Sequence, residues 1–121
     1  MEYVFGKISK NVLWNYLATS SGLSAWFADD VQIKENLYTF IWDESPAEAE
    51  LLNIVPNSKI CFKWIEDEES PESCFEFKLH TDEITGAIIL EITDFAEPEE
   101  KDDAINLWDS QIKLLKRTLG I

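Results

Sequence analysis

The stretch ESCFEFKLH, residues 72–80, limits more than any other what this chain can fold into. Apolar residues occupy every second position with polar or small residues between them, so that Phe75, Phe77 and Leu79 alternate with Cys74, Glu76, Lys78 and His80. Successive side chains of a strand point to opposite faces, so the pattern predicts a strand with one covered face and one face in water. Such a strand needs partner strands and elements that cover its apolar face.

The same period of two recurs along most of the chain. It is found in EYVFGKI (2–8), VQIKEN (31–36), LYTFIWD (37–43), AEAELLNIV (47–55), KICFKWIED (59–67) and GAIILEITDF (86–95). In the last of these, Ile88, Leu90 and Ile92 form the apolar side and Ile89, Glu91 and Thr93 the opposite side. These stretches predict an antiparallel sheet of about seven strands. Turn residues at 66–73 and 81–86 predict that neighbours in sequence pair as a meander.

The pairing of two of these strands can also be predicted. If Phe62 and Phe75 share the covered face, the wet face carries the pairs Cys61–Glu76 and Lys63–Cys74. The two cysteines then lie on a diagonal and do not face each other. One pair of cysteines does not make the disulfide framework of a secreted domain, so we expect reduced thiols.

Three segments show helical periodicity instead. In AINLWDSQIKLLKRTLG, residues 104–120, apolar residues recur every three or four positions, at Ile105, Trp108, Ile112, Leu115 and Leu119. This stripe predicts a long amphipathic helix. KNVLWNYLAT, capped by Ser9, and the segment with Leu23, Trp26 and Phe27 predict two short helices interrupted by SSG. They form an elbow, whose Trp26 and Phe27 plug one end between the sheet and the last helix.

Charge and length limit the partners. The chain has 121 residues with 24 Asp and Glu against 10 Lys and Arg, a formal charge of −14, which disfavours both nucleic acid and anionic membrane surfaces. Apolar runs are too short to span a bilayer, and MEYVFGKISK lacks the pattern of a signal peptide. We therefore expect one cytoplasmic domain, residues 1–121, with neither nucleic acid nor membrane as a partner.

The sequence offers few candidates for catalytic or metal-binding residues. His80 is the sole histidine and falls on the wet face, so a surface role is favoured over a general base. Cys61, Cys74 and Glu76 lie near one another but lack a fourth ligand and CxxC spacing. The acidic runs EDEES and EPEEKDD lack a calcium-loop pattern and predict solvated loops. We expect no catalytic residue, no cofactor and no metal.

Asp29 and Asp30 follow the plug directly. They are either carboxylates at the mouth of a cavity or part of the turn that leads from helix to strand, and the turn is favoured.

The stretch LWNYLATSSGLSAWFADDV, residues 13–31, together with YTFIWD, ICFKW, EITDFA and LWDSQIKLLKRTLG, resembles the START-like, helix-grip superfamily. Within it, the chain is most similar to the branch related to the activator of heat-shock-chaperone ATPase. The most specific motif is LW..L followed by GL..WF.D. The matching residues are Leu13, Trp14, Gly22, Leu23, Trp26, Phe27 and Asp29 at the elbow, Trp64 on a strand, and Trp108 on the last helix. A very short first strand and a helix at the end of the sequence indicate a minimal version.

The resemblance implies an α+β helix-grip fold. In it a curved antiparallel sheet clasps the long C-terminal helix in its concave face, with the two-helix elbow after strand 1. Family members commonly enclose a cavity between sheet and helix. The residues that we expect around such a cavity are Trp26, Phe27, Tyr38, Phe40, Trp42, Phe62, Trp64, Phe75, Phe77, Leu90, Trp108 and Ile112.

Three functions follow from these expectations. The leading hypothesis is non-enzymatic binding of a small hydrophobic or aromatic molecule in that cavity. The alternative is a protein-interaction or co-chaperone-like module, since an acidic surface suits a basic partner. An enzyme is least favoured, because Tyr38 and Asp94 are the only polar groups expected inside. The chain is expected to be a monomer, or a homodimer paired through the edge of its short first strand.

Overall fold

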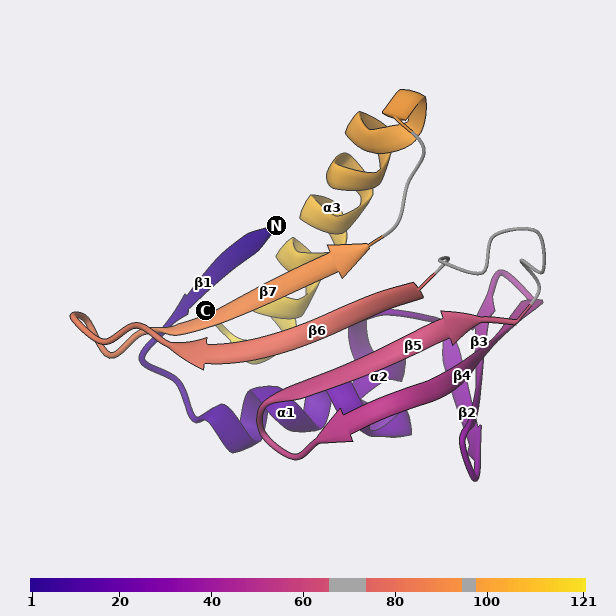
Figure 1. The fold of residues 1–121 in the computed structure, drawn as a ribbon, viewed down its shortest axis with the longest axis horizontal. Helices are drawn as coiled ribbons and strands as arrows, with labels where there is room; N and C mark the ends of the chain where they lie inside the picture. Colours follow the sequence, from indigo (N-terminus) through magenta and orange to yellow (C-terminus); the bar gives the residue numbers. More distant parts are fainter. Residues whose placement is uncertain (66–73, 95–97) are drawn as a thin grey trace.

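The computed structural model describes residues 1–65, 74–94 and 98–121. Within these ranges, seven strands and three α-helices follow one another (Figure 1). The elements are β1 (Glu2–Gly6), α1 (Lys10–Ala18), α2 (Ser20–Trp26), β2 (Asp30–Lys34), β3 (Leu37–Trp42), β4 (Ser45–Val55), β5 (Lys59–Trp64), β6 (Cys74–Thr81), β7 (Ile88–Asp94), the 3-10 turn η1 (Pro98–Glu100) and α3 (Lys101–Leu119). The acidic run at 66–70 lies outside the described residues. The run at 97–103 was predicted to be a loop, but its residues from Pro98 on form η1 and the first turn of α3, where acidic side chains stabilise the helix dipole.

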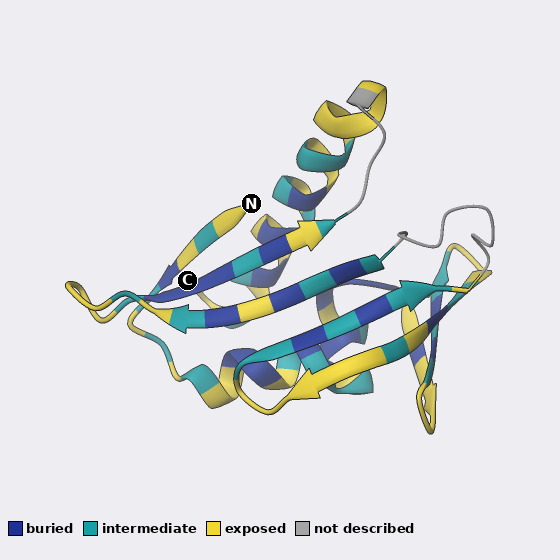
Figure 2. Ribbon diagram, in the orientation of Figure 1, coloured by how far each residue is buried: buried dark blue, intermediate teal, exposed yellow. Residues whose placement is uncertain are grey.

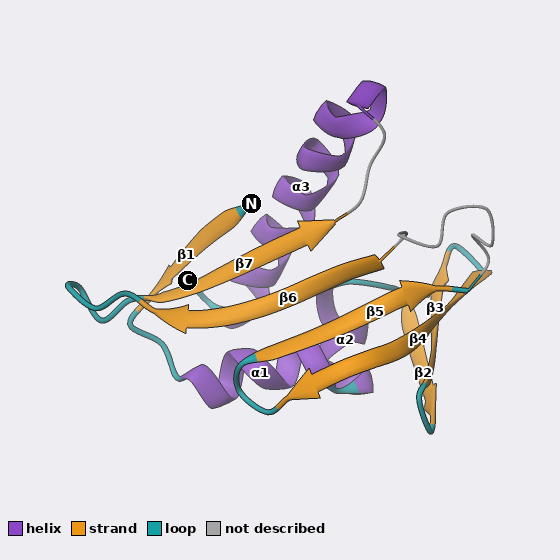
Figure 3. Ribbon diagram, viewed as in Figure 1, coloured by secondary structure: helices purple, strands orange, loops and turns teal. Residues whose placement is uncertain are grey.

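The strands form one antiparallel sheet in the order β1-β7-β6-β5-β4-β3-β2. From β2 to β7 each strand pairs with its neighbours in sequence, which confirms the predicted meander, and β1 completes the sheet beside β7. The predicted register of β5 and β6 is confirmed as well, because Phe62 faces Phe75 and Cys61 faces Glu76. The three helices lie on the same side of this curved sheet (Figure 3).

Alternation along the strands sorts side chains between the two faces of the sheet. In Figure 2, buried residues alternate with half-buried or exposed ones along β6. Phe75 and Phe77 are buried in the single core cluster, as predicted. Ile89 departs from the expected pattern: it lies on the outer face of β7 and is only 9% exposed. Ile89 pairs with His80 on β6 and with Val4 on β1, so it lies on the middle one of three strands. These neighbours explain why its side chain is nearly buried.

Thr19 forms the corner of the elbow. Its backbone is extended, and its side chain ends α1 and begins α2. The Thr19 hydroxyl donates to the Asn15 carbonyl oxygen at 2.6 Å and accepts the Gly22 N–H at 3.0 Å. The break was expected at SSG, but these three residues form the first turn of α2. Threonine can cap the new helix from an extended conformation, which moves the break to the preceding residue.

Helix α3 begins three residues earlier than the apolar stripe predicted, at Lys101. The stripe itself is confirmed, since Trp108, Ile112 and Leu115 are buried. Asp102 and Asp103 in the first turn and Lys116 and Arg117 in the last turn have the charges that stabilise a helix dipole. Gly120 ends the helix with a left-handed backbone, φ 79°, and donates its N–H to the Arg117 carbonyl oxygen.

Two contacts fasten α3 to the edge strand β1. The Tyr3 hydroxyl donates to Asp109 Oδ1 at 2.6 Å, and the Lys116 ammonium lies 5.2 Å from the centre of the Phe5 ring. Burial, followed by the hydrogen bond to Asp109 and its charge, raises the pKa of Tyr3 well above its usual range. None of the described helices is long and apolar enough to cross a membrane.

We predict that Gly22→Ala destabilises the elbow. A Cβ at this position would overlap the backbone carbonyl oxygen of Asn15, so α1 and α2 must move apart. Overpacking of this kind costs about 1–3 kcal/mol, which urea denaturation would measure as a loss of unfolding free energy. The neighbouring exposed variant Ser21→Ala serves as the control, and equal stability of the two variants would contradict the close approach.

We also predict a loss of stability at high pH that depends on Tyr3. Its folded pKa is raised, so the stability from the protonated phenol is complete below about pH 10, the unfolded value, and declines as the pH rises further. Denaturation at a series of pH values should show a shallower decline for Tyr3→Phe than for the parent chain. A parental slope in Tyr3→Phe would refute the assignment.

Candidate functional site

Phe27 is the ring on which the inner side of the molecule converges. It follows α2 directly and stacks on Trp108 of α3, with ring centres 5.8 Å apart and an interplanar angle of 16°. From the sheet it meets Phe40 at 5.0 Å and Trp42 at 5.3 Å, both edge to face. Such pairs contribute about 0.5–1.5 kcal/mol each beyond the burial of their area. The predicted plug between sheet and helix is therefore present.

Most of the expected cavity residues pack into solid core. Phe62 and Phe75 stack with centres 5.0 Å apart, and Tyr38 meets Phe62 edge to face at 4.8 Å. Burial raises the pKa of the Tyr38 hydroxyl, which donates to the Ala18 carbonyl oxygen at 3.4 Å. The expected residues that pack in this part of the core are Trp26, Tyr38, Phe40, Phe62, Phe77, Leu90 and Ile112.

The remaining five expected residues surround a small pocket where the sheet opens beside α3. This mouth pocket has a volume of about 140 Å³. Its rings are Phe27, Trp42, Trp64, Phe75 and Trp108, and its other lining residues are Asp94, Ala104, Leu107 and Gln111. Trp42 and Trp64 are half-buried, whereas Phe27, Phe75 and Trp108 are buried. The expected residues are thus brought together in two sets, five at the mouth and seven behind it.

The polar groups of the mouth pocket hold its walls in place. Asp94 Oδ2 accepts the indole N–H of Trp108 at 2.8 Å. The Phe27 carbonyl oxygen accepts the indole N–H of Trp42 at 2.7 Å and the side-chain amide of Gln111 at 3.4 Å. The indole N–H groups of Trp42 and Trp108 are therefore satisfied by the protein, and these two rings offer an apolar wall to an occupant.

A second depression adjoins the mouth pocket on the side of the elbow. This elbow groove has a volume of about 400 Å³ and shares Phe27, Trp42 and Gln111 with the mouth pocket. It runs along α2 and is also lined by Leu114 of α3. Leu107 is 60% exposed and Leu114 is 43% exposed. The two leucines lie one turn before and one turn after Gln111 on α3. Leu107 therefore borders the mouth pocket and Leu114 the elbow groove.

Asp29, Asp30 and the two cysteines lie outside the mouth pocket, and Asp29 lines the elbow groove beside it. Asp29 Oδ2 accepts the Asp43 N–H at 2.7 Å and Asp30 Oδ1 accepts the Val31 N–H at 2.9 Å, as the turn interpretation predicted. Cys61 is a free thiol on the outer face, and its pKa is raised by burial and by the nearby Cys74 and Glu76.

Sequence reasoning missed three residues of the mouth pocket. Ala104, Leu107 and Gln111 were not candidates, because they lie beside the apolar stripe of α3 and not on it. Their spacing of three and four residues was the available signal. Asp94 was expected to point inward, and it does line the pocket.

Comparisons with known proteins agree with the fold. A family model described as a START-like superfamily domain matches residues 1–121. No curated protein matches the chain. A Bacteroides fragilis protein solved by NMR in solution is 42% identical with a TM-score of 0.70, and the alignment covers 100% of this chain and 89% of that one.

Two further solved structures share the fold at lower identity. The Aha1 dimer from Colwellia psychrerythraea is 20% identical with a TM-score of 0.75, covering 100% of this chain and 96% of that one. The protein MLL2253 from Mesorhizobium loti is 18% identical with a TM-score of 0.76, covering 99% and 94%. At these identities the likeness shows the fold alone.

We predict that Phe27→Ala removes a large part of the stability. Phe27 contacts rings from β3, β6 and α3, and truncation of a buried Phe costs about 3–5 kcal/mol. Trp64→Ala is the comparison variant at the half-buried rim and should lose less unfolding free energy in the same urea titration. A larger loss in Trp64→Ala would show that Phe27 is not the central contact.

Proposed function

Since this chain belongs to the START-like superfamily, we propose that it binds a small apolar or aromatic molecule in the mouth pocket. Members of the superfamily bind hydrophobic ligands. The observation that carries the proposal is the convergence of five aromatic rings, from the end of α2, β3, β5, β6 and α3, around one opening. The catalytic constellations sought in the sequence were not found, so we propose binding without covalent chemistry.

The volume of the pocket limits the ligand. At about 140 Å³ it is close to the roughly 150 Å³ of an engineered cavity that holds benzene, and well below the roughly 300–1,000 Å³ of pockets for drug-sized ligands. A single aromatic ring fits without rearrangement. A longer molecule would keep its ring there and extend past Gln111 into the elbow groove.

Charge further narrows the ligand class. The chain has a formal charge of −14, and Asp94 lines the pocket. A carboxylate ligand would meet repulsion from both, whereas a neutral or cationic aromatic molecule would not. We therefore place neutral and cationic one-ring compounds ahead of fatty acids.

The proposal predicts that phenol, as a neutral one-ring probe, binds the parent chain and not Ala104→Leu. Ala104 lines the pocket from α3 and is half-buried, so the added carbons occupy the space for the ring. NMR titration with phenol should shift signals of Trp64 and Trp108 in the parent chain alone. Asn106→Leu adds a larger apolar group at an exposed position of the same helix and should bind as the parent does.

Further probes extend the same titration to benzylamine, as a cationic one-ring compound, and to a flavonoid, a sterol and a fatty acid. If none of these compounds shifts signals of the mouth pocket, the proposed function is wrong. Unchanged binding in Ala104→Leu would show that the ligand binds at another part of the molecule and not in the mouth pocket.

A second candidate function is recognition of a protein, as in co-chaperone-like relatives of the Aha type. The exposed Leu107 and Leu114 on α3, beside the half-buried Trp42, favour it. The Colwellia relative was solved as a dimer, which makes a second copy the first partner to test. In sedimentation equilibrium, Leu114→Lys should dissociate a dimer that forms through this face. Leu52→Lys, 51% exposed on β4, is the matched control, and a monomeric parent chain would exclude self-association.

A further inference from the structure

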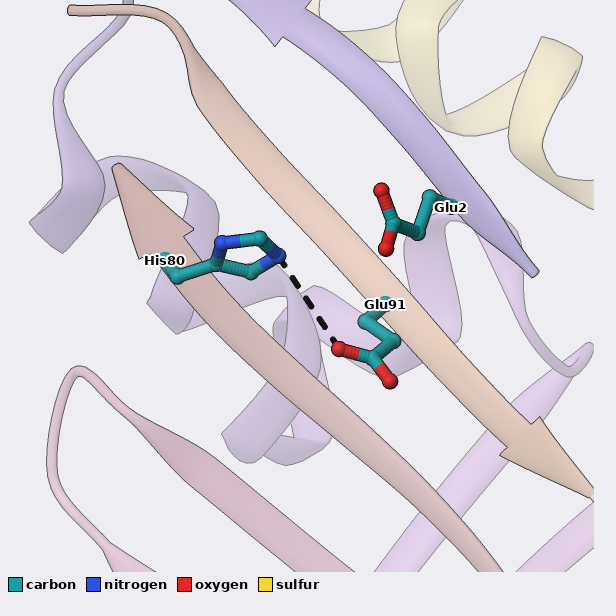
Figure 4. Close-up of side chains that lie close together, drawn as sticks. All are labelled: Glu2, His80 and Glu91. Carbon is teal, nitrogen blue, oxygen red and sulfur yellow. Dashed lines mark ion pairs between the residues drawn. The ribbon is translucent and has the colours of Figure 1, made fainter. Parts of the chain in front are cut away.

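We propose that Glu2, His80 and Glu91 form a binding site for a divalent transition metal, Zn²⁺ first among them, on the outer face of the sheet. The three side chains come from three adjacent strands, β1, β6 and β7 (Figure 4). One ligand atom from each lies within 4.8 Å of the other two. Within the described part of the chain, this is the group of three metal-ligating side chains that lie close enough to share an ion.

The pairing of the strands produces this cluster. Glu2 faces Glu91 directly across the β1–β7 pair, and His80 faces Ile89, two residues from Glu91 on the same strand. Residues two apart on a strand share a face, so the imidazole reaches the two carboxylates along the outer surface. His80 Nε2 lies 3.9 Å from Glu91 Oε2, which is too far for a hydrogen bond.

Two carboxylates in direct opposition need a positive charge. Like charges facing each other across two strands destabilise a sheet. The cation that pairs with Glu91 among the described residues is His80, and only in its protonated form. Lys78 also faces Glu91 in the register, so it competes with a metal for that carboxylate. A divalent cation would neutralise both carboxylates at once.

The imidazole nitrogen gives independent support. His80 Nε2 is buried and has no hydrogen-bond partner among the described residues. An unpaired buried polar atom costs about 1–3 kcal/mol, and a metal bond would satisfy it. The side chains of His80 and Glu91 are 42% and 38% exposed, so an ion can reach the site from solvent.

The donor set selects the metal. One imidazole nitrogen and two carboxylate oxygens suit Zn²⁺ better than Ca²⁺ or Mg²⁺, which prefer oxygen alone. Three protein ligands leave the fourth position of a tetrahedral site for water. Zinc bonds of about 2.0–2.2 Å place neighbouring ligand atoms closer than they are here, so binding requires side-chain rotations while the strands stay fixed. The bound ion would tie the edge strand β1 to β7 and β6.

This site shares no residue with the mouth pocket and lies on the other face of the sheet. Leu90 and Ile92, on either side of Glu91, point into the core, so Glu91 lies on the face opposite α3. The thiols of Cys61 and Cys74 are also on the outer face and are competing zinc ligands. The experiment must separate these two sets of ligands.

The test is zinc titration of the untagged chain by calorimetry, with a parallel titration of Co²⁺ followed by absorption. The parent chain should bind one zinc ion, and cobalt should show no thiolate charge-transfer band. His80 is the sole histidine, so ¹⁵N-edited NMR of its ring reports metal ligation at Nε2 directly. His80→Gln and Glu2→Gln should each weaken zinc binding about tenfold or more.

Glu76→Gln is the matched control, because Glu76 is an outer-face carboxylate of β6 outside the cluster, and it should bind zinc as the parent does. Glu2 is exposed at the sheet edge, so its variant keeps the fold even if His80→Gln loses stability. Absence of zinc binding, unchanged binding in both cluster variants, or a thiolate band with cobalt would each overturn the proposal.

Discussion

The stack of Phe27 on Trp108 is the contact on which the rest of the structure depends. It joins the end of the elbow to the middle of α3, and both rings also contact Phe75 and Phe77 of β6. It closes an interior that the sheet, the elbow and the helix also share through Trp26 against Phe77 and Phe77 against Trp108. The close approach at Gly22 sets the direction of α2 and so delivers Phe27 to this position.

The same crowding of rings determines where a ligand can be accommodated. Phe40, Phe62 and Phe77 fill the space deep between sheet and helix, and each is completely buried. The unfilled volume remains at the edge of this packed set, where Trp42 and Trp64 are half-buried and α3 presents Ala104. The mouth therefore shares Phe27, Phe75 and Trp108 with the core, whereas Trp42 and Trp64 form its half-buried rim.

The sequence predicted features that depend on local periodicity. The alternating positions of Phe75 and Phe77 predicted that both side chains lie on the covered face of the sheet. The register of β5 and β6 followed from that face. The position of the pocket could not be predicted, because an empty volume depends on how large rings pack against residues distant in sequence, such as Gln111. The Glu2–His80–Glu91 cluster was missed for a related reason. The cluster forms because β1, near the N-terminus, pairs with β7, which is distant in sequence. The alternation of residues within each strand does not predict this pairing or its register.

Strand β1 connects the two faces of the molecule. Glu2 points outward to the cluster with His80 and Glu91, while Tyr3, the next residue, points inward and bonds Asp109 of α3. Neighbouring residues of a strand share one backbone, so a contact that fixes Glu2 also restricts Tyr3. Trp108 lies next to Asp109 on α3 and lines the mouth pocket. A restraint on β1 therefore also restrains a residue of the pocket wall. An ion on the outer face would thus also restrain α3, because it would immobilise the strand to which that helix is bonded.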